Sequence, residues 1–168
     1  MRSESSGKTY LDLSSFSYDH SGVTIDVGFS LLNSKVDRRQ NVQSQYTREA
    51  SQQLIRFGYI TRHRYFFGLG YAVDRHNISD SHDTDLSYQN ENYMAGLGYN
   101  FINNFYGRGY FVRQKNDYNL KSYLGYRLDF GYKINLLENF FLTTAISYQQ
   151  TGPVWSTQPG ISLGLFIF

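Results

Sequence analysis

Apolar and polar residues alternate with a period of two along most of this chain. The clearest example is the segment 23–31, VTIDVGFSL, in which every odd position is apolar and every even position is small or polar. Successive side chains of a β-strand point to opposite faces of its sheet. The pattern therefore predicts strands with one apolar face and one polar face, and helical periodicity is nearly absent.

Eight segments of this kind follow one another between residues 22 and 168. They lie at 23–31, 55–59, 67–74, 93–101, 105–113, 124–134, 142–149 and 161–165. Short connections are expected at 61–64, 102–104 and 135–138, and longer polar ones at 37–49, 78–89, 114–119 and 150–158. Short turns on one side and longer loops on the other are typical of barrels in the outer membrane. We predict an all-β fold, an antiparallel up-and-down transmembrane β-barrel of about eight strands.

The contents of the polar face favour a membrane barrel over a soluble one. A soluble barrel would turn its apolar face inward around a mostly apolar cavity. Here the polar face combines many glycines with charged residues, which suits a narrow lumen filled by small side chains and ion pairs. We predict that these charges form a network that fills the lumen, with a narrow or gated pore as the alternative. The members are Asp26, Arg56, Asp74, Arg108, Arg127, Asp129 and Lys133.

Composition agrees with a thin sheet in a membrane. The chain contains 16 Tyr and 13 Phe but only 18% charged residues, compared with about 25% in soluble domains. Aromatic residues near the strand ends are expected to form girdles at the two membrane interfaces. Those on the apolar face are Tyr59, Tyr99, Phe101, Phe105, Tyr132 and Tyr148.

The segment 105–113 fits two registers. Placing Tyr106, Tyr110 and Val112 on the apolar face would also expose Arg108 to lipid. Arginine near the centre of a bilayer costs roughly 2–4 kcal/mol. We therefore predict that Arg108 faces the lumen and that Phe105 and Phe111 face outward.

Several classes of function and partner are disfavoured. The net charge of +2 is too small and dispersed to suggest nucleic acid binding, and the absence of cysteine excludes thiolate metal sites and disulfides. Nothing in the sequence predicts a metal or cofactor. No apolar stretch approaches the roughly 20 residues of a membrane helix.

The segment 1–21 precedes the eight strands. Residues 9–18 could form a further strand, so this region is interpreted as a periplasmic tail, a lumen plug or an extra strand. It contains no apolar stretch of a secretory signal peptide, so an exported protein would begin here as a trimmed mature chain.

The last nine residues, GISLGLFIF, resemble the final strand of small Gram-negative outer-membrane barrels of the OmpA/OmpX type. The resemblance implies an outer-membrane location with extracellular loops and periplasmic termini. It also implies that the terminal aromatic residues, Phe166 and Phe168, are read by the barrel-assembly machinery. Phe166 and Phe168 share the parity of Ser162 and Gly164, so either a bulge lies near Leu165 or both faces are apolar at this rim.

One polar segment suggests chemistry. His76, Ser79, His82 and Asp83 lie close together in the sequence at the predicted outer rim. A serine becomes a nucleophile beside a base that an acid orients, which would suit a lipid A acyltransferase or deacylase. A solvated loop is the simpler interpretation.

Basic residues gather on and beside the long loops. Arginine and lysine bind phosphate, so we predict contacts with lipopolysaccharide in the outer leaflet. The candidates are Lys35, Arg38, Arg39, Arg48, Arg113, Lys115 and Lys121.

The leading functional hypothesis is a non-enzymatic barrel with a structural or surface-binding role, whose loops contact lipopolysaccharide, a host surface or a partner protein. A low outer surface is expected rather than a protruding sheet. The alternatives are the membrane part of a larger export assembly and a lipid A-modifying enzyme.

Overall fold

The computed structural model describes residues 21–36, 46–80, 85–101, 104–117, 120–137 and 139–167. Most of these residues lie in β-strands. Within these ranges, no helix is long and apolar enough to cross a membrane. Residues 1–20, for which a tail, plug or extra strand was predicted, lie outside the described part.

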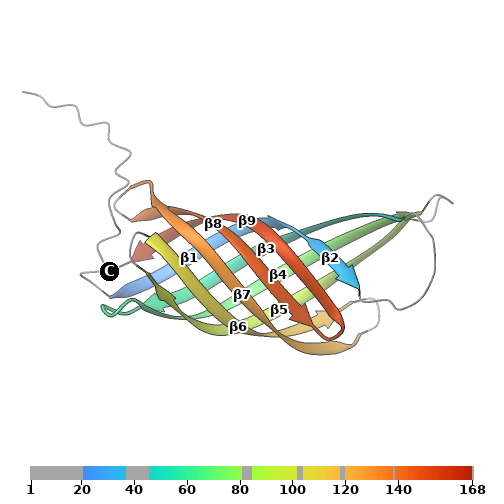
Figure 1. Cartoon of the computed structure of the whole chain (residues 1–168), viewed down its shortest axis with the longest axis horizontal. Helices are drawn as coiled ribbons and strands as arrows, with labels where there is room; N and C mark the ends of the chain where they lie inside the picture. Colours follow the sequence, from blue (N-terminus) through green and yellow to red (C-terminus); the bar gives the residue numbers. More distant parts are fainter. Residues whose placement is uncertain are drawn as a thin grey trace, which may run out of the picture.

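The described strands form one closed antiparallel sheet (Figure 1). The order along the sheet is β1-β3-β4-β5-β6-β7-β8-β9, and β1 also pairs with β9. The short β2 continues β1 and pairs with β9, so the predicted eight-stranded barrel is confirmed. The strands are β1 Gly22–Leu31, β2 Asn33–Val36, β3 Tyr46–Ile60, β4 Tyr65–Asp80, β5 Asp85–Asn100, β6 Phe105–Asn116, β7 Ser122–Asn135, β8 Phe140–Thr151 and β9 Val154–Ile167.

A proline accompanies the break between β1 and β2. The β1–β9 ladder ends at Ser30 opposite Gly160 and resumes in the same register with Asn33 opposite Thr157. In this register Pro159 lies opposite the end of β1, and proline has no N–H to donate. On the other side of β1, the N–H of Leu32 donates to the carbonyl oxygen of Ala50 on β3, at 2.9 Å.

The predicted faces are confirmed by burial. Inward positions are buried or half-buried, while the large apolar residues of the alternating positions lie exposed on the outer wall. In β6 the predicted register holds: the exposed fraction is 3% for Arg108, 55% for Phe105 and 60% for Phe111. The cost of a lipid-facing arginine therefore identified the correct register.

Small residues make room for aromatic rings inside the barrel. A Cβ atom added at Gly58 or Gly68 would collide with the ring of Phe66, and one at Gly164 would collide with the ring of Phe141. These inward glycines thus leave the space that the inward aromatic rings occupy.

Short turns lie at one end of the barrel. The N–H of Thr61 donates to Tyr65, that of Phe101 to Phe105 and that of Leu136 to Phe140, at 2.7–2.9 Å. These bonds close the short connections that the sequence predicted. The other end of the barrel, called here the loop end, differs from the prediction in two ways.

The long connection predicted at 150–158 is wrong. Only Gly152 and Pro153 separate β8 from β9. Gly152 has a φ of +56°, the conformation that glycine permits at the first central position of a tight hairpin turn. The surrounding residues were read as a loop because they are polar, whereas Ser156 and Gln158 are polar because they face the lumen.

The connections predicted at 78–89, 114–119 and 37–49 are also too long, because strands continue into them. β4 runs to Asp80 and pairs with β3 as far as Tyr46 and with β5 as far as Asp85. On the flanks, β1 pairs with β3 only from Ser51 onward, and β6 pairs with β5 only from Asn90 onward.

Residues 46–50, 76–80 and 85–89 therefore form a three-stranded extension that continues past the neighbouring strands. Figure 1 shows β3, β4 and β5 reaching furthest, at the end opposite to where β9 ends. A low surface was expected at this end, and the structure instead has a sheet that protrudes past the neighbouring strands. Backbone pairing requires no apolar face where a strand does not contact hydrocarbon. Such a segment lacks the alternation from which a strand is predicted, so the extension could not be predicted from the sequence.

The last strand has no bulge. β9 pairs with β1 in one register from Gly160 to Ile167. The side chain of Phe166 is fully buried inside the barrel, whereas Ile167 is exposed outside. Both faces are therefore apolar at this rim; Phe168 lies outside the described residues.

Candidate functional site

The interior of the barrel is arranged in layers. Nearest the short turns lies an aromatic layer, in which the rings are almost completely inaccessible to solvent. Its members are Phe66, Tyr106, Phe141 and Phe166, together with the side chain of Ile60. This layer closes the end of the lumen where β9 ends.

A charged layer lies next to the aromatic layer. Nε of Arg56 lies 2.6 Å from Oδ1 of Asp26, and Nη1 of Arg56 lies 2.8 Å from Oδ2 of Asp129. Nε of Arg127 lies 2.6 Å from Oδ1 of Asp129. All four side chains are buried, and buried charges are tolerated only when they are paired in this way.

Arg108 connects the charged and aromatic layers. Its Nη1 lies 3.8 Å from Oδ2 of Asp26, and its guanidinium carbon lies 3.9 Å from the centre of the Phe66 ring. Strand register places Asp26 opposite Arg56, whereas Arg108, which lies opposite Asp129 in β7, has its carboxylate contact with Asp26 on β1. The charge and the ring face then attract each other by a cation–π interaction.

Two of the seven predicted lumen charges lie outside this layer. Lys133 is fully buried beside the aromatic layer, with Nζ 5.1 Å from the centre of the Phe141 ring. Asp74 lies toward the loop end, where Nε2 of Gln52 donates a 2.7 Å hydrogen bond to its Oδ1. The structure thus brings the other five into contact and places these two on either side.

Neutral amides form the next layer, which the sequence analysis missed. Nη1 of Arg127 donates to Oε1 of Gln52 at 2.6 Å and to Oε1 of Gln158 at 2.8 Å, which links this layer to the charges. Gln114 and Gln149 both donate to Oδ1 of Asn92, at 3.0 and 3.1 Å. Each of these residues has the inward parity of its strand, and that parity was the available signal.

Beyond the amides the lumen opens into a cavity of about 200 Å³ at the loop end, called here the vestibule. It is lined mainly by amide, hydroxyl and aromatic side chains. The ring of His76 stacks on that of Tyr88, with centroids 4.6 Å apart and planes 19° apart. The lining residues are Leu32, Asp74, His76, Tyr88, Asn90, Gln114, Asn116, Tyr123, Gln149, Thr151, Pro153, Val154 and Ser156.

The predicted catalytic set is only partly described. His76 faces the interior, where its Nε2 lies 3.3 Å from Nδ2 of Asn90. Ser79 is paired through its backbone with Asp85, but its side chain is not described, and His82 and Asp83 lie outside the described residues. A catalytic role for these residues stays a prediction.

The predicted lipopolysaccharide contacts divide in the same way. Arg113, Lys115 and Lys121 are exposed near the loop end, and Arg75 on β4 is exposed there too, although the sequence analysis did not select it. For Lys35 and Arg48 the structure describes only the backbone, in β2 and β3. Arg38 and Arg39 lie outside the described residues.

The outer wall is apolar between two rings of aromatic side chains. Near the short turns, Tyr99 lies edge-on to Tyr65 and to Phe101, with centroids 5.4 Å apart in each pair. Toward the loop end, Tyr71 contacts Tyr93 at 5.3 Å. Tyr126 and Trp155 flank Tyr148 in the same ring of side chains, which confirms the predicted aromatic girdles.

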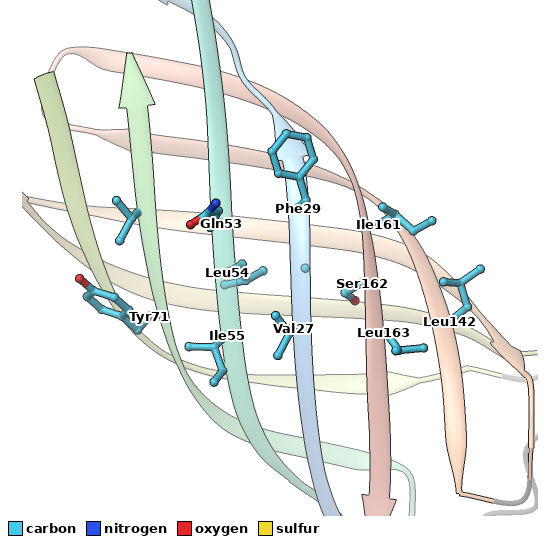
Figure 2. A pocket seen from close by; sticks show the side chains of 12 residues that line it. Val27, Phe29, Gln53, Leu54, Ile55, Tyr71, Leu142, Ile161, Ser162 and Leu163 are labelled. Carbon is cyan, nitrogen blue, oxygen red and sulfur yellow. The ribbon is translucent and has the colours of Figure 1, made fainter. Parts of the chain in front are cut away.

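An open depression of about 620 Å³ lies on this outer wall over β1, β3 and β9. Figure 2 shows Val27, Ile55 and Leu163 among the side chains that border it. Its lining is mostly aliphatic and continues that of the surrounding wall. Such a surface is compatible with acyl chains and contrasts with the polar vestibule.

A closed eight-stranded barrel with an apolar outer band, two aromatic girdles and a charged interior is a small outer-membrane β-barrel. No protein family and no curated protein matches the chain in sequence. Solved structures with the same fold include the attachment invasion locus protein Ail of Yersinia pestis, crystallised with the heparin analogue sucrose octasulfate. It is 15% identical, with a TM-score of 0.58 over 88% of this chain and 99% of its own.

Two further barrels are similar to the same extent. OprG of Pseudomonas aeruginosa is 15% identical, with a TM-score of 0.58 over 89% of this chain and 98% of its own. The neisserial surface protein NspA is 12% identical, with a TM-score of 0.57 over 87% of this chain and 98% of its own. At these identities the similarity establishes the fold and leaves function to the residues of this chain.

Proposed function

We propose that this chain is a non-conducting, non-enzymatic barrel that binds macromolecules at the cell surface through its three-stranded extension. The extension carries the proposal. Among the described residues, no strand pairs with β3 before Ser51 on one flank or with β5 before Asn90 on the other. The flanking backbone makes one further contact on each side, from Leu32 to Ala50 and from Asp117 to Gln89. Open sheet edges of this kind are templates to which an extended segment of another protein can add a strand.

The extension also supports an orientation. Open sheet edges are not tolerated in hydrocarbon, so the extension must lie in water. The short turns are at the opposite end, as they are on the periplasmic side of outer-membrane barrels. We therefore place the loop end outside the cell, with β9 ending at the periplasmic rim, where Phe166 and Phe168 would meet the assembly machinery.

The filled interior supports the absence of conduction. The side chains of the aromatic and charged layers occupy the cross-section, and those of Arg56, Arg108, Arg127 and Asp129 are all nearly inaccessible. Moving these paired charges aside would leave them unpaired in a low-dielectric interior. Purified protein in planar bilayers should show no reproducible unitary current, and a steady conductance would contradict this part of the proposal.

Binding by the extension can be tested with a trimmed chain. Residues 78–86 are replaced by Asn-Gly, so that Asn77 and Ser87, which already pair, are joined by a two-residue hairpin turn. Bacteria displaying the full or trimmed barrel are compared for retention on surfaces coated with heparin, with serum proteins or with a blocking agent only.

Trimming should reduce specific retention at least tenfold on the coating that the full barrel binds. Surface display of the two forms is matched by labelling with an amine-reactive, membrane-impermeant reagent. Equal retention of the full and trimmed forms, or no retention above the blocked surface, would refute binding by the extension.

We also propose that Arg113, Lys115 and Lys121 contact lipopolysaccharide phosphates, as would the basic residues whose side chains are not described. Arg113 is exposed at the level of the girdle residue Tyr93, and Lys115 and Lys121 are exposed further toward the loop end. Charge removal by Arg113→Gln with Lys115→Gln should lower co-purification of lipopolysaccharide by severalfold relative to Gln150→Leu on the same wall. Unchanged co-purification would exclude these two contacts.

A further inference from the structure

We propose that the vestibule is a binding site for one uncharged sugar unit. The site lies inside the rim of the barrel and uses inward side chains, whereas surface binding was assigned to the extension. His76 and Tyr88 belong to both regions, but the trimmed chain keeps them, and the vestibule variants at Gln149 and Tyr123 lie outside the extension, so the two proposals can fail separately.

Charge excludes most other classes of ligand. Of the described residues that line the vestibule, none is lysine or arginine. Phosphates, sulfates and carboxylates would therefore enter without a lysine or arginine to pair with. The carboxylate of Asp74 already accepts a hydrogen bond from Gln52 at 2.7 Å, and the walls are polar enough to disfavour a purely apolar ligand. A neutral, hydrogen-bonding ligand remains.

The amides offer the donors and acceptors that hydroxyl groups require. Nδ2 of Asn116 donates to Oδ1 of Asn90 at 2.7 Å, and Oγ1 of Thr151 donates to Oε1 of Gln114 at 3.1 Å. These bonds hold the side chains in place, and each amide or hydroxyl retains further hydrogen-bonding capacity. A sugar hydroxyl both donates and accepts, so it can use either kind of site.

One buried acceptor at this site has no partner. Gln149 is 2% exposed, and its Nε2 donates to Asn92, but its Oε1 accepts no hydrogen bond. An unsatisfied buried acceptor costs roughly 1–3 kcal/mol. Gln149 belongs to the vestibule lining, but this oxygen has almost no accessible surface. A ligand hydroxyl would reach it after rotation of the side chain, and the new hydrogen bond would then remove that cost.

Aromatic and aliphatic groups complete the lining. The ring of Tyr88 is held by its stack on His76, and Tyr123, Leu32 and Val154 contribute further apolar surface. A pyranose ring has an apolar face of C–H groups as well as its hydroxyls. A pocket that combines oriented amides with aromatic faces matches both features.

Size limits the ligand to a single ring. A cavity of about 200 Å³ is smaller than the roughly 300–1,000 Å³ of pockets for drug-sized ligands. A hexose fits this volume, and the charged layer beneath prevents it from passing further. The site would bind a sugar without transporting it.

The test uses the full chain in a phosphocholine detergent, because maltoside and glucoside headgroups would compete for the site. Methyl glycosides of glucose, galactose, mannose and N-acetylglucosamine are titrated, and the side-chain amide resonances of Asn and Gln are followed by NMR. At least one neutral glycoside should produce saturable shifts, while glucuronate at the same concentration should produce none.

The variant Gln149→Leu should weaken that binding at least tenfold. Its matched control is Gln150→Leu, the same substitution at the next residue, which lies on the outer wall and accepts a hydrogen bond from Tyr126. A second variant, Tyr123→Leu, tests the aromatic wall independently. Circular dichroism and resistance to unfolding in detergent establish that each variant is folded.

Absence of saturable shifts with every glycoside, or equal affinity of the chain and of folded Gln149→Leu and Tyr123→Leu, would overturn the proposal. If a glycoside binds, an oligosaccharide that ends in the same sugar distinguishes the sources. Tighter binding of the oligosaccharide would indicate the end of a glycan, and equal binding a free sugar; both support the site.

Discussion

Leu128 and Asp129 are adjacent in β7 and meet opposite environments. Leu128 lies on the outer wall with 41% of its surface exposed, whereas Asp129 is fully buried and contacts both Arg56 and Arg127. Neither face is an ordinary aqueous surface. Any apolar side chain is tolerated on the outer wall. Each interior side chain, in contrast, needs a particular hydrogen-bonding or ion-pair partner and must have a particular volume. Substitutions should therefore follow different rules on the two faces.

The largest effect is expected for Asp129→Ala. Removing this carboxylate leaves Arg56 and Arg127 without one of their partners, and breaking a buried pair typically costs about 3–5 kcal/mol. The free energy of unfolding can be measured by urea titration in lipid vesicles, with fluorescence from the single tryptophan, Trp155. A loss below 1 kcal/mol would show that the charged layer does not stabilise the barrel.

Leu128→Arg tests the opposite face of the same strand. A cation in the lipid-facing band should reduce stability by roughly 2–4 kcal/mol. The matched control is Leu120→Arg, in the connection beyond the loop-end girdle, where the same change should cost about 0–1 kcal/mol. Equal losses in vesicle refolding would contradict the assignment of the outer wall.

Gly68→Val and Gly109→Val compare how much added side-chain volume the interior and the outer wall tolerate. A Cβ at Gly68 would collide with the ring of Phe66, so overpacking should cost about 1–3 kcal/mol. Gly109 faces outward, and its added Cβ would make only an ordinary contact with Leu128. Unfolding titrations should therefore show a loss for the first variant alone; a comparable loss for both would mean that volume is not limiting inside.

The smallest effect is expected for Asp74→Asn. The new amide oxygen can still accept the hydrogen bond from Gln52, and no ion pair is broken, so stability should change by no more than about 1 kcal/mol. The same titration checks this value. A loss as large as that of Asp129→Ala would mean that the amide layer depends on charge as much as the charged layer does.

The sequence analysis was most accurate where hydrocarbon imposes a strict rule. The eight strands, their two faces and the register of β6 around Arg108 all follow from the cost of exposing polar groups to lipid. The analysis was least accurate at the loop end. There the strands β3, β4 and β5 continue past their neighbours without the apolar alternation, and the turn at Gly152 and Pro153 lies among polar residues that face inward.

The candidate sites also contain some features that single strands predict and others that depend on several strands together. Inward parity could be assigned to Asp26, Arg56 and Asp129 one strand at a time, but their mutual contacts depend on strands that are distant in the sequence. Asp74 and Lys133 have the same parity and yet lie outside the charged layer. The vestibule could not be predicted because its amides are neutral and form no motif or charge cluster in the linear sequence.

The sequence alone determined the alternation of apolar and polar residues. The closed sheet and its lipid-facing surface follow from that alternation, because side-chain direction in a strand depends only on local position. Tertiary structure alone decided which inward residues share a level, which strands extend beyond their neighbours and where a cavity remains. Those features depend on the stagger between neighbouring strands and on closure of β1 against β9, and both are relations between segments that no single segment encodes.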